Sequence, residues 1–124
     1  MKTLVLVIVS MFTLTAFADW NYATPVASPI TNTTPVAIVA ANSALKTTVK
    51  SFQIFNSHAT VGSVVTLRNG TTVLWTGYSP ANGVHPIVVN LDVPLIGSTN
   101  TALNFVVETT GANVFISAQG SQSR

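Results

Sequence analysis

The stretch SVVTLRNGTTVLWTGY, residues 63–78, decides the fold class of this 124-residue chain. Two runs rich in Val, Thr and aromatic residues flank Asn69-Gly70, and an Asn-Gly pair between such runs is the strongest short-range signal for a β-hairpin. In a type I′ turn both central residues have positive φ, so we expect a two-residue turn that places Val64 opposite Trp75. The sequence therefore predicts a hairpin, and with it an all-β protein.

Apolar runs outside the hairpin recur at intervals of about 8 to 14 residues, the spacing typical of β-sandwiches. We expect further strands in the ranges 35–41, 47–56, 87–91, 101–109 and 114–119. The alternation within 47–56 is imperfect, which indicates either a bulge or a change of face there. Pro94 is expected at an edge or at a strand end, because proline cannot donate a backbone hydrogen bond. The pattern predicts a single-domain antiparallel β-sandwich, jelly-roll-like, with about seven to eight strands.

The first eighteen residues have the pattern of a secretory signal peptide. Lys2 gives a basic start, an apolar run follows, and Ala16-Phe17-Ala18 precedes Asp19 as a small-residue cleavage site. The alternative is a hydrophobic N-terminal strand, because residues 4–9 are strongly β-prone. The apolar run is too short for a stable membrane span.

The remaining chain divides into three parts. Residues 19–34 contain Pro25 and Pro29 among many Ser, Thr and Asn, which predicts an extended arm rather than a helix or a central strand. Residues 35–120 carry the strands of the sandwich, and the polar residues 121–124 are expected to fray.

The chain is poor in charge. Only 6% of its residues are charged and 48% are hydrophobic, which excludes a disordered body. The surface must consist largely of Thr, Ser, Asn and Gly, and it lacks the charge repulsion that discourages association, so we expect a homo-oligomer or a partner. The five basic residues form no cluster, which argues against nucleic-acid binding.

No constellation of catalytic or metal-binding residues is visible. Beyond the leader the carboxylates are Asp19, Asp92 and Glu108, and the histidines are His58 and His85. A glycosidase needs two acids a few ångströms apart, which these could form only by a coincidence of topology. The histidines lack ligand spacing, the chain has no cysteine, and no G-x-S-x-G motif is present. We predict a non-enzymatic protein without a catalytic residue, metal or cofactor.

Four aromatic residues are the candidate binding residues: Trp20, Tyr22, Trp75 and Tyr78. Exposed aromatic rings stack on sugars or anchor protein contacts. The alternative is structural, with Trp20 and Tyr22 anchoring the arm on the body and Trp75 filling the core.

Six segments resemble a small family of β-rich proteins encoded among the structural genes of tailed phages and prophages. They are Trp20-Asn21-Tyr22-Ala23, Ile30–Thr34, Phe52–Asn56, Val73-Leu74-Trp75, Pro94–Leu103 and Thr109–Val114 with its continuation to Gln119-Gly120. The block Pro94–Leu103 is the most specific. The resemblance implies a virion-associated protein, such as a capsid decoration or accessory protein, and it carries no catalytic or ligand residues.

Two functional hypotheses follow. The first is a structural virion protein that contacts phage capsid or other virion proteins. The second is an exported periplasmic or cell-surface module that binds glycans through exposed aromatics, with residues 1–18 removed.

Overall fold

Runs of Val, Ile, Thr and aromatic residues, which favour extended backbone, are broken by Pro, Gly and Asn. They form eight strands in the part of the chain that the computed structural model describes, residues 20–23, 28–83 and 85–124. The strands are β1 (Trp20–Ala23), β2 (Val36–Ala37), β3 (Lys46–Asn56), β4 (Ser63–Asn69), β5 (Thr72–Ser79), β6 (Ile87–Ile96), β7 (Leu103–Val107) and β8 (Val114–Ser123).

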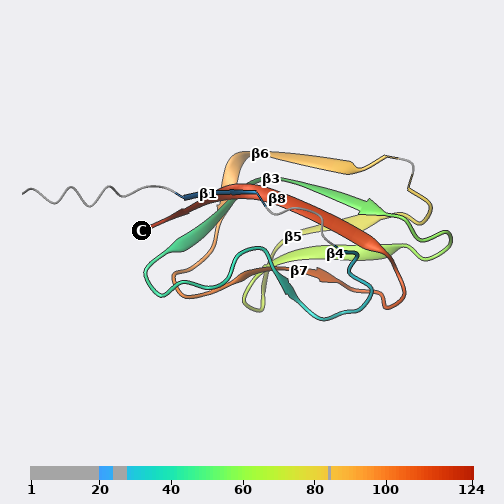
Figure 1. Cartoon of the computed structure of the whole chain (residues 1–124), viewed down its shortest axis with the longest axis horizontal. Helices are drawn as coiled ribbons and strands as arrows, with labels where there is room; N and C mark the ends of the chain where they lie inside the picture. The colour runs from blue at the N-terminus through green and yellow to red at the C-terminus, as the bar shows by residue number, and fades with distance from the viewer. Residues whose placement is uncertain (1–19, 24–27, 84) are drawn as a thin grey trace, which may run out of the picture.

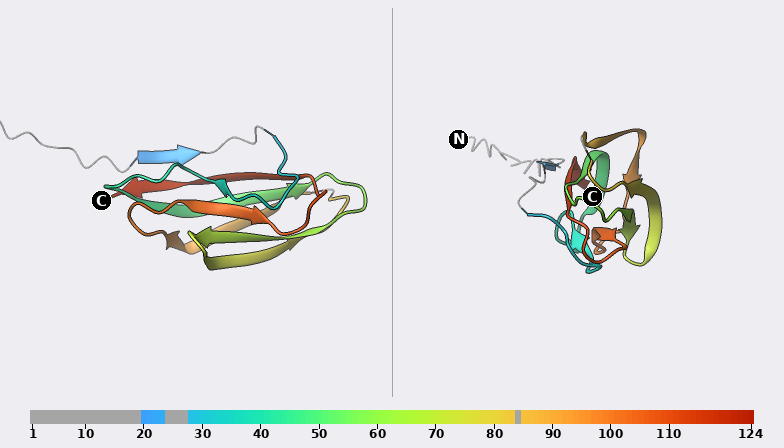
Figure 2. Two further views of the ribbon diagram at one scale, coloured as in Figure 1. Left: turned by 90° about the horizontal axis from the view of Figure 1, so that it is seen from below. Right: turned by 90° about the vertical axis from the view of Figure 1, so that its right-hand side faces the viewer.

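The strands form two four-stranded antiparallel sheets that pack face to face (Figures 1 and 2). Sheet A has the order β1-β8-β3-β6, and sheet B has the order β2-β7-β4-β5. Strand β1 thus lies beside β8, β2 beside β7, β3 beside β6 and β4 beside β5. In each of these four pairs an earlier strand lies beside a later one, which is the strand arrangement of an eight-stranded jelly roll. The predicted all-β sandwich is confirmed.

The core lies between the sheets and is filled by alternate residues of the inner strands. In β7 the side chains of Leu103, Phe105 and Val107 are buried, as their alternation predicts. The Phe52 ring on β3 meets the rings of Trp75 at 4.8 Å and Phe105 at 5.3 Å between centroids, both edge-on. These aromatic contacts join β3 of sheet A to β5 and β7 of sheet B, the two strands that lie on either side of β4.

The central hairpin is present as β4 and β5, but its predicted register is wrong. Within the turn of this hairpin only Gly70 has a positive φ, of 60°, and Asn69 pairs with Thr72. The turn therefore places Gly70 first of its two central residues, as in a type II′ turn, because glycine alone adopts this φ without strain. A register shift follows, so that Trp75 pairs with Leu67 instead of Val64. The shift moves the Trp75 ring onto the core side, where Phe52 lies.

Strand limits also differ from those predicted. The second strand is limited to Val36–Ala37, and β6 continues through Pro94, which lies on the edge strand of sheet A as expected. Residues 121–124 were predicted to fray, but β8 runs to Ser123 because Gln122 pairs with Trp20 on one side and Thr47 on the other.

The predicted arm contributes the edge strand β1, and the predicted leader, residues 1–18, lies outside the described residues. In the described ranges, no helix is long and apolar enough to cross a membrane.

One buried amide ties the loops together at one end of the sandwich. The side chain of Asn56 is 1% exposed, and its Nδ2 donates to the carbonyl oxygens of Val61 at 2.8 Å and Ser79 at 3.5 Å. Its Oδ1 accepts the backbone N–H groups of His58 at 3.0 Å and Asn113 at 3.3 Å. Three connections, β3–β4, β5–β6 and β7–β8, therefore meet at this residue.

Candidate functional site

A bulge in β3 interrupts the outer face of sheet A. Val49 and Ser51 pair with the consecutive residues Gly120 and Gln119 of β8, so Lys50 has no partner there. On the other side of β3 the same two residues pair with Leu95 and Asn90 of β6, which leaves residues 91–94 between them. A bulge of this kind redirects a side chain and is common at functional sites. Here it leaves Lys50 exposed.

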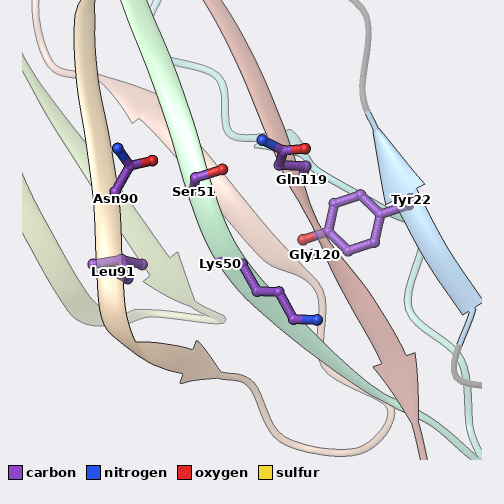
Figure 3. A pocket seen from close by; sticks show the side chains of 7 residues that line it. All are labelled: Tyr22, Lys50, Ser51, Asn90, Leu91, Gln119 and Gly120. Carbon is purple, nitrogen blue, oxygen red and sulfur yellow. The ribbon is translucent and has the colours of Figure 1, made fainter.

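A hollow of about 580 Å³ lies at this bulge, and we call it the Lys50 hollow (Figure 3). Asn90, Ser51 and Gln119 are register partners across β6, β3 and β8. Paired residues point to the same face of a sheet, so these three polar side chains form a row. Four strands contribute its lining: Tyr22, Lys50, Ser51, Asn90, Leu91, Gln119 and Gly120.

Tyr22 forms one wall of the hollow and fixes β1 to the sheet. Its hydroxyl donates to the Thr48 carbonyl oxygen at 2.9 Å, across Gly120. A Cβ on Gly120 would lie 1.8 Å from that carbonyl oxygen and 2.9 Å from the tyrosine hydroxyl, so only glycine fits. Burial raises the pKa of the Tyr22 hydroxyl to about 12. The wall is therefore neutral and acts as a hydrogen-bond donor and an apolar ring.

Lys50 is the only charged side chain in the lining. Within the described ranges, the side chains of Lys50, Ser51, Asn90 and Gln119 have no hydrogen-bond or ion-pair partner. The ammonium offers three donors, and each amide offers both donors and acceptors. Among the described residues of the lining, Lys50 supplies a positive charge and the amides of Asn90 and Gln119 supply polar groups, which suits binding of a polar, anionic molecule.

The candidate aromatic side chains that the structure describes, Tyr22, Trp75 and Tyr78, do not meet at one site. Tyr22 lines the Lys50 hollow, and Trp75 packs on Phe52 in the core, one of the two interpretations given above. Tyr78 is 61% exposed and lies on β5, near the loops joined by Asn56. The backbone of Trp20 pairs with Gln122, and its side chain lies outside the described residues.

The acidic residues and histidines are also dispersed. Asp92 is exposed on β6, and Asp19 lies outside the described residues. Glu108 forms an ion pair with Arg68 and accepts a hydrogen bond from the Thr66 hydroxyl at 2.8 Å.

His85 is exposed, whereas His58 Nδ1 accepts the backbone N–H groups of Thr60 at 3.2 Å and Val61 at 2.9 Å. Among the residues that the structure describes, no group of three His, Asp or Glu could hold a metal ion.

Sequence reasoning missed the polar members of the Lys50 hollow. The imperfect alternation in residues 47–56 indicated either a bulge or a change of face, and a bulge is observed between Val49 and Ser51. That signal could have identified Lys50. It could not have identified Asn90 or Gln119, because only the sheet order places β6 and β8 on either side of β3.

A second surface feature is the side of the sandwich formed by the outer strands β5 and β6, which we call the β5–β6 edge (Figure 2). Of the eight large hydrophobic side chains that are exposed in the described ranges, six lie on these strands. They are Val73 and Tyr78 on β5, and Ile87, Val88, Val93 and Ile96 on β6. Asp92 is the only charged residue in either strand.

Comparison with known proteins found no matching family model, no matching curated protein and no matching solved structure.

Proposed function

We propose that this protein is a non-enzymatic structural protein of a phage particle, which decorates or stabilises the particle through protein–protein contacts. The observation that carries the proposal is the β5–β6 edge. Val93 is 79% exposed, Ile96 is 59% exposed and Val88 is 54% exposed. They lie on one strand, in which Asp92 is the only charged residue. Soluble proteins usually protect such an edge with lysines or a covering loop.

The edge has the chemistry of a protein-binding surface. The first half of β6, Ile87–Asn90, pairs with β3 on one side only, so its other side presents backbone N–H and C=O groups. An added strand can pair with these groups while apolar side chains pack beside it. Pro94 and the bulge at residues 91–94 prevent continuous pairing along the second half. The segment of β6 that can pair with an added strand is therefore short, and the bulge fixes where it ends.

We assign a second copy of this chain to the edge. Eight charged side chains in 124 residues give a net charge of +2, so copies repel one another weakly. Both strands of the edge carry exposed apolar side chains, which suits contact between the same surfaces of two copies. Jelly rolls are common in viral capsid proteins, and this fold supports the particle reading together with the resemblance to tailed-phage proteins. A fold alone does not assign a function, so the edge is the feature to test.

The test measures the oligomeric state and particle binding of two matched variants. Val93→Asp places a charge on the edge at a fully solvated position, whereas Val36→Asp makes the same change on β2, the opposite edge of sheet B. We expect Val93→Asp to shift the mass in analytical ultracentrifugation to the monomer and to reduce co-sedimentation with purified particles. Val36→Asp should leave both unchanged. A wild-type protein that is monomeric and does not sediment with particles would refute the proposal.

The proposal places the protein in the phage particle, and the alternative is a protein exported to the periplasm or the medium. The intact mass of the protein from its native source distinguishes these two locations. A chain that begins at Met1 or Lys2 in purified particles agrees with the particle role. A chain that begins at Asp19 in the periplasm or the medium would indicate cleavage after Ala18 and an exported binding module.

A further inference from the structure

The Lys50 hollow gathers polar side chains that do not bond to one another. Two other polar groups on the surface are satisfied internally: Arg68 is neutralised by Glu108, and the Asn69 side chain bonds to Ser98. In the hollow, Lys50 has no carboxylate partner and the Asn90 amide has no protein partner. Polar side chains that converge without pairing are available to a ligand.

The arrangement defines what such a ligand must look like. The row Asn90, Ser51 and Gln119 supplies alternating donors and acceptors along one line of the sheet. Adjacent hydroxyl groups of a sugar both donate and accept, so an amide row suits a saccharide better than it suits a bare anion. The ring of Tyr22 borders the hollow and offers an apolar surface to the C–H face of a sugar.

The positive charge of Lys50 adds a second requirement that the ligand must meet. Lys50 is exposed beside the row and is the only charged group of the lining, so the hollow carries a net positive charge. An ammonium group forms a charge-assisted hydrogen bond with a carboxylate, which is stronger than a bond between neutral groups. A ligand that carries an anionic group, such as a carboxylate, in addition to its hydroxyl groups therefore fits the lining.

We propose that the Lys50 hollow binds an acidic saccharide, one that carries a carboxylate as uronic or sialic acids do. Lys50 binds the carboxylate, Asn90 and Gln119 bind hydroxyl groups, and Tyr22 packs against the sugar ring. The site lies on the outer face of sheet A and uses different side chains from the apolar ones of the β5–β6 edge. It does not rest on the proposed particle role, because the isolated protein would bind in either setting.

The test is a titration of the full-length protein, labelled with ¹⁵N, followed by NMR. The probe is a tetrasaccharide of alternating glucuronic acid and N-acetylglucosamine, and cellotetraose is the neutral comparison. We expect the acidic probe to shift the amide signals of Lys50, Asn90 and Gln119. Cellotetraose should bind at least about tenfold more weakly, because it lacks the carboxylate.

Two lysines of the same strand provide matched variants. Lys50→Met should weaken binding of the acidic probe by about tenfold or more, whereas Lys46→Met should change it by less than about twofold. Lys46 is also exposed on β3 but does not line the hollow. Equal unfolding midpoints in urea establish that both variants are folded. Asn90→Ala should weaken the acidic probe and cellotetraose by the same factor, because the lost bonds go to hydroxyl groups.

Three results would overturn the proposal. The first is the absence of localised shifts with the acidic probe. The second is equal binding by Lys50→Met and the wild-type protein. The third is binding of inorganic phosphate as tightly as the acidic probe with no effect of Asn90→Ala, which would make the hollow a simple anion site.

Discussion

Replacing Asn56, the last residue of β3, by alanine should cost more stability than replacing an asparagine in the loops. The change removes three well-formed hydrogen bonds, to Val61, His58 and Asn113, and a fourth at the 3.5 Å limit to Ser79. Each bond contributes about 1 kcal/mol, and a buried group left without a partner costs about 1–3 kcal/mol. We expect a loss of about 3–4 kcal/mol, a large part of the roughly 5–15 kcal/mol available to a domain of this kind.

The measurement is urea unfolding followed by tryptophan fluorescence. Asn42→Ala is the control, because the Asn42 side chain accepts a single exposed hydrogen bond, from the Ala44 N–H at 2.9 Å, and this variant should lose less than about 1 kcal/mol. Asn56→Asp keeps the acceptor oxygen but places a carboxylate against the carbonyl groups of Val61 and Ser79, so it should be no more stable than the alanine variant. A similar loss for Asn56→Ala and Asn42→Ala, at unchanged m-value, would refute the reasoning.

Three further predictions concern the two sheets. Gly120→Ala should cost more than about 2 kcal/mol in urea unfolding, because its Cβ would meet the Thr48 carbonyl oxygen at 1.8 Å, whereas Tyr22→Phe should lose only about 1 kcal/mol with its single hydrogen bond. Because the pKa of Tyr22 is raised from 10.0 to about 12, its stabilising effect is complete below pH 10 and is lost as the pH rises to 12. Solvent screening of the partly exposed ring keeps the loss below roughly 2–3 kcal/mol, and urea midpoints of Tyr22→Phe should lack this decline. The side chains of Arg68 and Glu108 are 29% and 34% exposed, so a double-mutant cycle should give a coupling energy of about 0.5–1 kcal/mol. This coupling energy should fall at high salt, and a value independent of salt would contradict the prediction.

Much of the fold could be predicted from short-range patterns. The alternation of Leu103, Phe105 and Val107 identified a strand and its core-facing side, and Pro94 identified an edge. These signals are local, because they depend on the two-residue period of a strand and on a missing N–H group. The hairpin register was not predictable in the same way, because one extra residue in β5 moves every later side chain to the other face.

The candidate site was less predictable than the fold. The Lys50 hollow combines residues that are separated by up to 98 positions, from Tyr22 to Gly120. No pattern in the sequence states that β8 lies between β1 and β3. The aromatic candidates were chosen by residue type, and the fold distributes Tyr22, Trp75 and Tyr78 over three separate surroundings.

The place of β8 in sheet A affects how the protein is made in the cell. This strand follows the other seven described strands in the sequence, yet it lies between β1 and β3. A growing chain on the ribosome therefore cannot complete sheet A before β8 emerges, and β3 keeps an open edge until then. Such distant pairings fold slowly and leave strands available for wrong partners meanwhile. Termination after Ala118 would remove all four β8 residues that pair with β1, from Gln119 to Gln122. Residues 119–122 thus decide whether β1 can pair in sheet A.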